Sequence, residues 1–275
     1  MLPNFLVIGA MKAGTTSLHR YLREHPQVFM PDEKELDFFV AEKRWGRGRS
    51  WYEAQFAAAG EAVAVGEASP CYTMFPRFSG VPARVAQLLP HARLVYCVRH
   101  PIERMRSHYL HEVEKGRERA PIGRALVSDP RYLDASRYAM QLDQYLDRFS
   151  ARRILVISAE QLRDERAPTV ARVLAFLGVD PQWSSGSLLD QEFHLTSNKR
   201  VRRPLVEAAL RVPGTRALAE LAPRPVRRLA SRGIDTGRAT VIPEAVQAHL
   251  RAELRDDVVR LRVHAGDGFN GWGIG

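Results

Sequence analysis

The chain has 275 residues, two cysteines and a formal net charge of +10 at neutral pH. This length is sufficient for one large domain with a full hydrophobic core, and two cysteines are too few for a disulfide framework. The sequence lacks the run of about 18 apolar residues of a membrane-spanning helix, and its short apolar start lacks the basic flank of a signal peptide. We therefore expect a soluble, cytoplasmic protein that folds as a single domain over residues 1–275.

Short apolar runs alternate with helical patterns along most of the chain. The runs predict strands at Phe5–Ile8, Val63–Val65, Leu94–Val98 and Ile154–Ile157. Apolar residues at three- and four-residue spacing predict helices at Thr15–Leu22, Pro82–Leu89, Ile102–Val113, Asp134–Phe149, Thr169–Leu177 and Pro243–Val263. Short buried strands separated by helices predict an α/β fold, with a central parallel sheet flanked by helices and ligands at the carboxyl ends of the strands.

The first predicted strand runs into a loop with the pattern of a phosphate-binding site. In the segment FLVIGAMKAGTTS, Phe5–Ser17, two glycines stand in the spacing GxxxxGTT. The segment resembles a P-loop, except that the lysine expected after the second glycine stands two residues before it, at Lys12. Amides at the start of the following helix would point at an anion held in the loop. For this segment alone, an ordinary strand-turn-helix with a solvated lysine is the alternative.

A second anion site is predicted after the third strand. A nucleoside-triphosphate enzyme with such a loop needs magnesium, held partly by an aspartate at the end of a neighbouring strand. The third strand instead ends in Arg99 and the fourth in Ser158. Arg99 offers a fork of donors for a phosphate group, and Ser107 in the next helix can join it. The sequence thus favours two anion sites without a metal, and a metal-dependent nucleotide kinase or other phosphotransferase is the alternative.

Most of the excess positive charge lies in one stretch. Between Lys199 and Arg232 there are ten Lys or Arg residues against two Glu residues. Such a stretch attracts a polyanionic nucleotide, an acidic acceptor or a nucleic acid, and charge alone does not distinguish them. A non-catalytic protein that binds anions or nucleic acid is therefore the second alternative.

Two motifs together resemble a known enzyme family. The pair FLVIGAMKAGTTSLHRYLREHP and RHPIERMRSHY resembles the 5′-phosphosulfate loop and the 3′-phosphate site of the PAPS-dependent sulfotransferases. The resemblance is closest to the branch that includes heparan sulfate N- and 3-O-sulfotransferases and their bacterial relatives. Further similar segments are PDEKELDFF, GEASPCY, SRYAMQLDQYLDRF, ILVISAEQL and NKRVRRP, so the resemblance spans nearly the whole chain. It implies a P-loop-like fold and transfer of a sulfuryl group from PAPS (3′-phosphoadenosine 5′-phosphosulfate), with no metal required.

The resemblance also implies which residues bind the nucleotide. The 5′-phosphate would be held by the amides and hydroxyls of Lys12, Ala13, Gly14, Thr15, Thr16 and Ser17. Lys12 would also stabilise negative charge on the leaving oxygen, while Arg99 and Ser107 would fix the 3′-phosphate. The remaining implied cofactor contacts are Tyr138 and, in a basic segment that closes over the nucleotide, Lys199 and Arg200.

The proton acceptor is assigned less directly. In the heparan sulfate branch the glutamate that precedes xxFF acts as the base, and the residue in that place is Glu35. Glu67 is the rival base, because it lies at the end of the second predicted strand. Histidine serves as the base in other sulfotransferase branches, so His100 and His111 remain outside candidates.

One departure from the family concerns positive charge near the transferred group. Relatives often carry a lysine after the glutamate of the second strand, whereas here that position is Ala68, and Lys34 is the candidate replacement. The acceptor is expected to be a hydroxyl of a glycan, a lipid or a small molecule, with nitrogen less favoured, and the net charge favours an acidic one. No nucleic-acid partner is expected, and the sequence does not indicate an oligomeric state.

Overall fold

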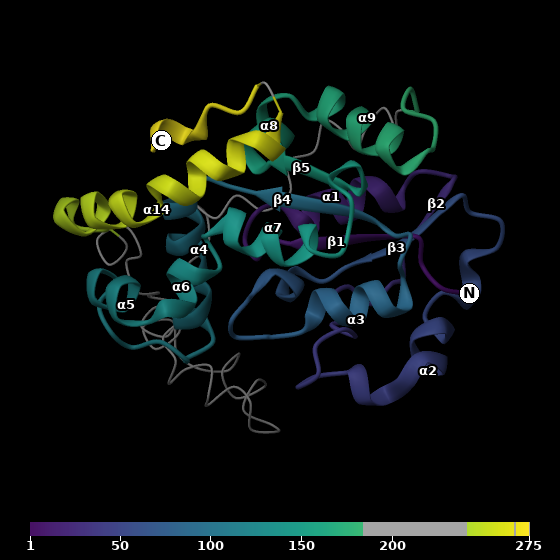
Figure 1. Ribbon diagram of the computed structural model, residues 1–275, viewed down its shortest axis with the longest axis horizontal. Coiled ribbons are helices and arrows are strands. Elements are labelled where there is room, and N and C mark those ends of the chain that lie inside the picture. The colour runs from purple at the N-terminus through teal and green to yellow at the C-terminus, as the bar shows by residue number, and fades with distance from the viewer. Residues whose placement is uncertain (184–240, 267, 275) are drawn as a thin grey trace, which may run out of the picture.

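The computed structural model describes residues 1–183, 241–266 and 268–274. In these residues a parallel sheet of five strands, in the order β2-β3-β1-β4-β5, is flanked by helices on both faces (Figure 1). The strands are β1 (Phe5–Gly9), β2 (Val28–Phe29), β3 (Ala64–Ala68), β4 (Arg93–Val98) and β5 (Ile154–Ser158). The four predicted strands are confirmed. β2 had no predicted counterpart because two residues carry no periodic signal.

The register brings the carboxyl ends of all the strands to one edge. Phe5 at the start of β1 pairs with Gly66 of β3 on one side and with Arg93 of β4 on the other. A Cβ atom added to Gly66 would lie 2.5 Å from the Phe5 ring, so the close approach of these strands requires glycine. Because every pair is parallel, the segments that leave β1, β3 and β4 meet at the edge where ligands bind in such sheets.

The helices confirm the predicted alternation. They are α1 (Thr15–Arg23), α2 (Gly48–Ala54), α3 (Val81–Leu88), α4 (Pro101–Glu114), α5 (Ile122–Ser128), α6 (Pro130–Asp134), α7 (Tyr138–Leu146), α8 (Ala159–Asp164), α9 (Arg166–Leu177) and α14 (Glu244–Ala265). α1 and α9 pack together on one face of the sheet, and α7 and α14 pack together on the other (Figure 1). None of the helices within the described ranges has the length and apolarity that crossing a bilayer requires.

A second apolar cluster supports α4 beside the sheet. It lies between α4, α5, α6 and α14 and includes Met105, Leu126, Tyr132, Leu254 and Val258, each at most 1% exposed. This packing fixes α4, which follows directly from β4, at the edge where the strands end.

The predicted helix Asp134–Phe149 is confirmed as α7, but α7 begins only at Tyr138, because Asp134 ends the separate helix α6. The Asp129 side chain accepts a backbone N–H at the start of α6 and so begins that helix. The Asp257 carboxylate of α14 accepts the N–H groups of Ala139 and Met140 at 3.0 and 2.8 Å and caps α7. This second cap lies 118 residues from Ala139, so no local pattern could reveal it.

Candidate active site

The loop between β1 and α1 has the shape that its glycines predict. Lys12 adopts a left-handed backbone with φ 68°, and Gly14, the residue that caps α1, has φ 90°. Glycine takes such a conformation at little cost, whereas Lys12 must be held in it by its surroundings. α1 begins with the three hydroxyl residues Thr15, Thr16 and Ser17, and the amides of a helix's first turn favour an anion at its N-terminus. The loop therefore offers an ammonium group, hydroxyls and amides in one place.

Arg99 lies beside this loop at the end of β4. Its Nη1 donates to the carbonyl oxygen of Lys12 at 3.4 Å, and its Nη2 lies 3.9 Å from the Glu103 carboxylate. Tyr138 of α7 is fully buried, and its hydroxyl donates to the carbonyl oxygen of Arg99 at 2.7 Å. Tyr138 thus supports the strand end that carries Arg99.

α4 turns a polar face toward the loop. The Nη1 of Arg104 donates to the carbonyl oxygen of Met11 at 3.4 Å. Ser107, 7% exposed, lies three residues further along, on the same side of the helix. Burial and then the nearby Lys12 ammonium lower the pKa of His111 to about 4, so Lys12 also lies close to this face. The predicted 3′-phosphate residues Arg99 and Ser107 therefore belong to the strand-helix unit that contacts the phosphate loop.

Arg104 was not singled out from the sequence. It shares its face of α4 with Ser107, His108 and His111, at spacings of three, four and seven residues. A polar stripe of this kind beside the apolar positions of the same helix is the signal that would have revealed it.

The other histidine considered as a base is His100. Burial lowers the pKa of His100, and its backbone N–H donates to the Glu160 carboxylate at 3.0 Å.

Glu35 lies in the segment after β2, which crosses the end of β3. Its N–H donates to the carbonyl oxygen of Ala68 at 3.2 Å, and its backbone is left-handed with φ 66°. Its carboxylate lies 2.6 Å from the Lys34 ammonium, and the side chain is 54% exposed. Burial raises the pKa of Glu35, but the ammonium groups of Lys34, Lys43 and Lys12 outweigh this effect and lower the pKa below its ordinary value. The carboxylate is therefore ionised at neutral pH and accessible to an acceptor.

Glu67, the rival base, has the opposite environment. Its side chain is 1% exposed and accepts hydrogen bonds from the hydroxyls of Tyr72 at 2.5 Å, Ser69 at 2.6 Å and Tyr52 at 3.2 Å. Burial raises the pKa of Glu67 to about 7, although the hydrogen bonds from Ser69 and Tyr72 oppose the rise. Glu35, and not Glu67, has the exposure that a base acting on an external acceptor requires.

Lys34, the predicted replacement for a lysine at position 68, directly precedes Glu35, whose N–H donates to the Ala68 carbonyl. The Lys34 side chain is 17% exposed. The pKa of His19 in α1 is lowered to about 4, mainly by burial and next by the positive charge of Lys34. The same charge also opposes the burial that raises the pKa of Cys97 in β4 to about 12. The positive charge of Lys34 thus acts on groups in both α1 and β4.

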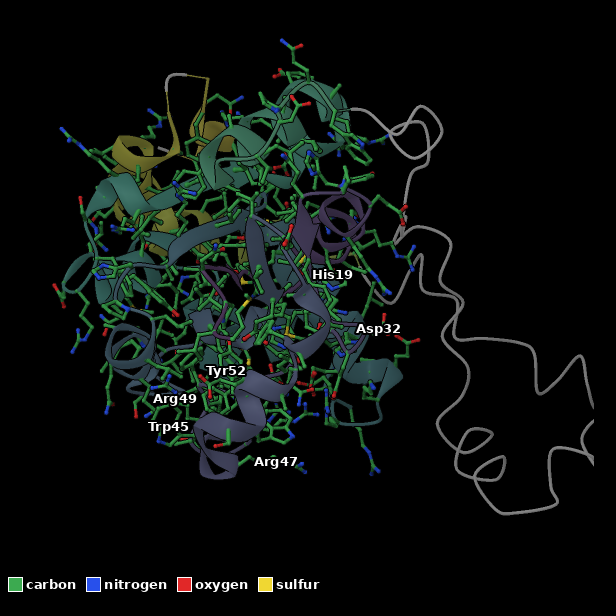
Figure 2. All side chains as sticks on the ribbon, turned by 90° about the vertical axis from the view of Figure 1, so that its right-hand side faces the viewer. His19, Asp32, Trp45, Arg47, Arg49 and Tyr52 are labelled. Carbon is green, nitrogen blue, oxygen red and sulfur yellow. The ribbon has the colours of Figure 1, made fainter. Side chains whose placement is uncertain are left out.

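The segment after Glu35 is tied to an outer corner of the molecule formed by residues 43–54. Asp37 pairs with Lys43 and accepts a hydrogen bond from the Cys71 thiol at 2.7 Å. Beyond Lys43, residues 45–54 form the 3-10 helix η1 and α2 (Figure 2). Figure 2 places Arg47 at the outer edge of this corner, where its guanidinium stacks over a tryptophan ring at 5.2 Å.

Lys199, Arg200 and the rest of the basic stretch 199–232 lie outside the described residues. Where the structure does describe side chains, no three His, Cys, Asp or Glu residues gather in a way that could hold a metal ion.

The chain is similar in sequence to known sulfotransferases. The family model described as "Sulfotransferase domain" matches residues 2–208. The human bifunctional heparan sulfate N-deacetylase/N-sulfotransferase 3 is 31% identical over 216 residues, covering 70% of this chain and 24% of that protein. The human heparan sulfate glucosamine 3-O-sulfotransferase 3B1 is 28% identical over 208 residues, covering 72% of this chain and 50% of that protein.

A solved structure shares the fold over almost the full length of the chain. It is a sulfotransferase from Alicyclobacillus acidocaldarius, with a TM-score of 0.71, 24% sequence identity and 99% of each chain covered. The curated relatives are longer proteins: the chain spans 24% of the first human enzyme and half of the second. Since the family match covers residues 2–208 of 275, the chain belongs to the sulfotransferase domain family.

Proposed function

We propose that this chain transfers a sulfuryl group from PAPS to an acceptor hydroxyl, with Glu35 as the base. The observation that carries the proposal is the position of Lys12. Its carbonyl oxygen accepts a hydrogen bond from Arg99 at 3.4 Å, and its ammonium helps to lower the pKa of Glu35. The residues that we assign to nucleotide binding and to proton transfer thus both interact with one lysine.

The donor groups fit a nucleotide with phosphates at two separate places. The loop supplies Lys12, the hydroxyls of Thr15, Thr16 and Ser17 and the first amides of α1 for the 5′-phosphate, while Arg99 and Ser107 suit the 3′-phosphate. Arg99 directly follows β4, and Ser158 is the last residue of β5. Neither is the carboxylate that a magnesium-dependent phosphotransferase places at such a strand end. PAPS, when bound, supplies an activated sulfuryl group and leaves as the 3′,5′-bisphosphate.

The chain's own residues would act on a proton and on charge. Glu35 accepts the proton of the acceptor hydroxyl as its oxygen attacks, and a positioned base of this kind contributes roughly 10² to 10⁴ in rate. Lys12 balances the charge that develops on the departing oxygen, an effect on the order of 3 to 4 kcal/mol for a single oxyanion donor. Lys34 adds a second positive charge and, because its ammonium lies 2.6 Å from Glu35, keeps that carboxylate ionised.

For the acceptor, we infer an acidic glycan as the first class to test. Two relatives are named for heparan sulfate. The formal net charge of +10 on the whole chain also suits an anionic acceptor. A lipid or a small-molecule hydroxyl is the other outcome of the same screen.

The test combines nucleotide binding with transfer of label. Calorimetry should show that adenosine 3′,5′-bisphosphate binds the wild type far more tightly than ATP does, and that Lys12→Ala and Arg99→Ala each abolish this binding. Radiolabelled PAPS should transfer its label to a glycan acceptor in the presence of EDTA. Turnover of ATP that is lost on adding EDTA would support a phosphotransferase instead. Equal binding of the bisphosphate and inorganic pyrophosphate, unchanged in both variants, would indicate a general anion-binding surface.

A further inference from the structure

Arg104 is the largest fully buried side chain among the described residues, with 0% exposure. Its Nε donates to the Ser136 hydroxyl at 2.6 Å, its Nη2 donates to the Tyr132 carbonyl at 2.6 Å, and its Nη1 lies 3.4 Å from the Met11 carbonyl and 3.5 Å from Nδ1 of His108. Burying a charge is costly unless it is hydrogen-bonded or paired. The four partner atoms are a hydroxyl oxygen, two carbonyl oxygens and an imidazole nitrogen, and all of them are neutral. None of these four contacts pairs the guanidinium with a carboxylate.

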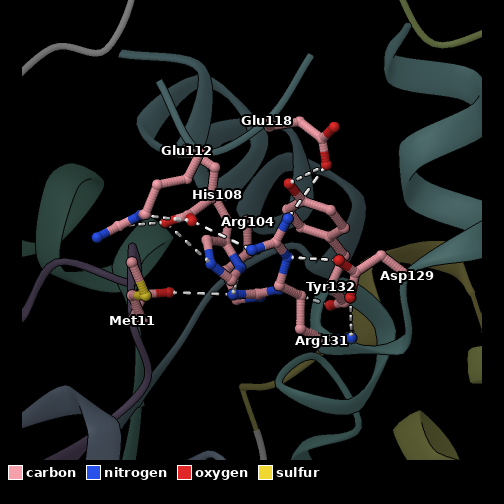
Figure 3. Close-up of polar contacts among 9 residues, drawn as sticks. Met11, Arg104, His108, Glu112, Glu118, Asp129, Arg131 and Tyr132 are labelled. Carbon is pink, nitrogen blue, oxygen red and sulfur yellow. Dashed lines mark hydrogen bonds and ion pairs between the residues drawn. The ribbon is translucent and has the colours of Figure 1, made fainter. Parts of the chain in front are cut away.

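The two ends of the guanidinium join different parts of the fold. One end holds Tyr132 and Ser136, at the end of α6 and the turn that follows it. The other end holds the Met11 peptide of the phosphate loop (Figure 3). The next carbonyl along the loop, that of Lys12, accepts a hydrogen bond from Arg99 at 3.4 Å. Two consecutive loop carbonyls are therefore turned toward β4 and α4. Since the C=O and N–H of a peptide unit point in opposite directions, these contacts orient the loop amides as well.

His108 remains a neutral acceptor because of its surroundings. Burial, followed by the charges of Arg104 and Arg131, lowers the pKa of His108 to about 2. Its Nε2 lies 3.9 Å from the Glu112 carboxylate (Figure 3). Glu112 in turn pairs with Arg117 at 2.6 Å and with Arg131 at 3.2 Å. The carboxylate of this cluster is thus occupied by the two outer arginines, and Arg104 is left with neutral partners.

We propose that Arg104 is a positioning residue for the nucleotide: it holds the Met11 peptide of the phosphate loop and places a buried positive charge behind the loop. The inference rests on the proposed function, since the anion that this charge favours is the nucleotide's 5′-phosphate. In a buried setting the attraction between the two is weakly screened. The loop conformation, including the left-handed Lys12, is thereby fixed before the nucleotide binds.

The test separates nucleotide affinity from stability. Calorimetry with adenosine 3′,5′-bisphosphate is carried out on the wild type, Arg104→Met, Arg104→Lys and the control Leu126→Ala. Leu126 is 1% exposed, packs in the same α4–α5–α6 cluster and has no part in the loop, so the control reports loss of packing alone. Arg104→Met is expected to weaken binding about 10- to 100-fold, the range for one charged hydrogen bond. Arg104→Lys should recover part of this loss because it keeps the charge, and Leu126→Ala should bind as the wild type does.

Binding by Arg104→Met within about twofold of the wild type, or an equal loss in Leu126→Ala, would overturn the inference. A wild type that does not bind the bisphosphate would instead overturn the proposed function. If Arg104→Met does not fold, Ser136→Ala serves in its place, because it removes one 2.6 Å hydrogen bond from Arg104 and keeps the charge. Its expected effect is about 3- to 10-fold weaker binding, and unchanged binding would again overturn the inference.

Discussion

The two sides of the phosphate loop are held in different ways. On the nucleotide side, hydrogen bonds from fully buried side chains support the site, as when Tyr138 donates to the Arg99 carbonyl and Arg104 donates to the Met11 carbonyl. On the acceptor side, Glu35 and Asp37 have left-handed backbones and are held by ion pairs near the surface. Exposed ion pairs contribute little to stability, whereas buried hydrogen bonds are costly to break. The nucleotide side is therefore expected to be sensitive in binding and stability, and the acceptor side in turnover.

The largest expected effect is that of Glu35→Gln on the acceptor side. Removing the base should lower kcat by roughly 10² to 10⁴. The affinity for adenosine 3′,5′-bisphosphate should change little, because Glu35 is not among the residues assigned to the nucleotide's phosphates. Steady-state transfer of labelled sulfate and calorimetry measure the two quantities. Unchanged turnover would assign the proton acceptor to Glu67 or a histidine, and a large loss of nucleotide affinity would remove the distinction between the two sides.

A second prediction concerns the pH dependence of stability. Burial raises the pKa of Glu67 from 4.5 to about 7, so the folded protein binds this proton more tightly than the unfolded chain does. The resulting stabilisation is complete below pH 4.5 and is lost as the pH rises through about 7. Glu67→Gln, which keeps an acceptor for the tyrosines and carries no charge, should remove up to about 3 kcal/mol of this pH dependence.

Urea denaturation of both proteins between pH 4.5 and 8 provides the measurement. Parallel stability profiles for wild type and Glu67→Gln would show that Glu67 does not titrate in this range. A loss of turnover in Glu67→Gln at every pH, with normal stability, would instead make Glu67 the base.

A matched pair of tyrosines on α7 sharpens the comparison further. Tyr138 donates to Arg99 at 2.7 Å on the nucleotide side, and Tyr145 donates to the Tyr72 carbonyl at 2.9 Å beside the Glu67 cluster. Each change to phenylalanine should cost about 1 kcal/mol of stability, since one buried hydrogen bond is lost. Only Tyr138→Phe should also weaken bisphosphate binding, by about fivefold. Equal effects of the two variants on calorimetric affinity would show that Tyr138 does not position Arg99.

The smallest expected effect belongs to the surface of the acceptor side. Arg49 of α2 pairs with Glu53 one turn later at 3.0 Å, and its side chain is 65% exposed. Arg49→Gln should lower the stability of the fold by about 0.3 to 0.5 kcal/mol, and less in high salt. Thermal unfolding at two ionic strengths measures this effect. A loss of several kcal/mol would contradict the view that ion pairs on this side contribute little to folding.

The local parts of the site were predictable from the sequence, and the parts made by distant residues were not. Lys12 and Arg99 each stand at the end of an apolar strand, so short segments were enough to place them at one edge of the sheet. The enclosure of Glu67 depends on Tyr52, 15 residues before it, and no pattern around Glu67 indicates that the carboxylate is buried. The same holds for Arg104, whose burial results from packing between α4, α6 and the loop.

The cap of α7 bears on where this fold can be divided. The region recognised by family similarity ends at residue 208, yet Asp257, from α14, supplies the acceptors that begin α7 within that region. α7 in turn carries the hydroxyl that holds the backbone of Arg99. The stretch that defines the family is therefore not self-sufficient, and a truncation chosen from sequence similarity alone would sever the link between the C-terminal helix and the nucleotide site.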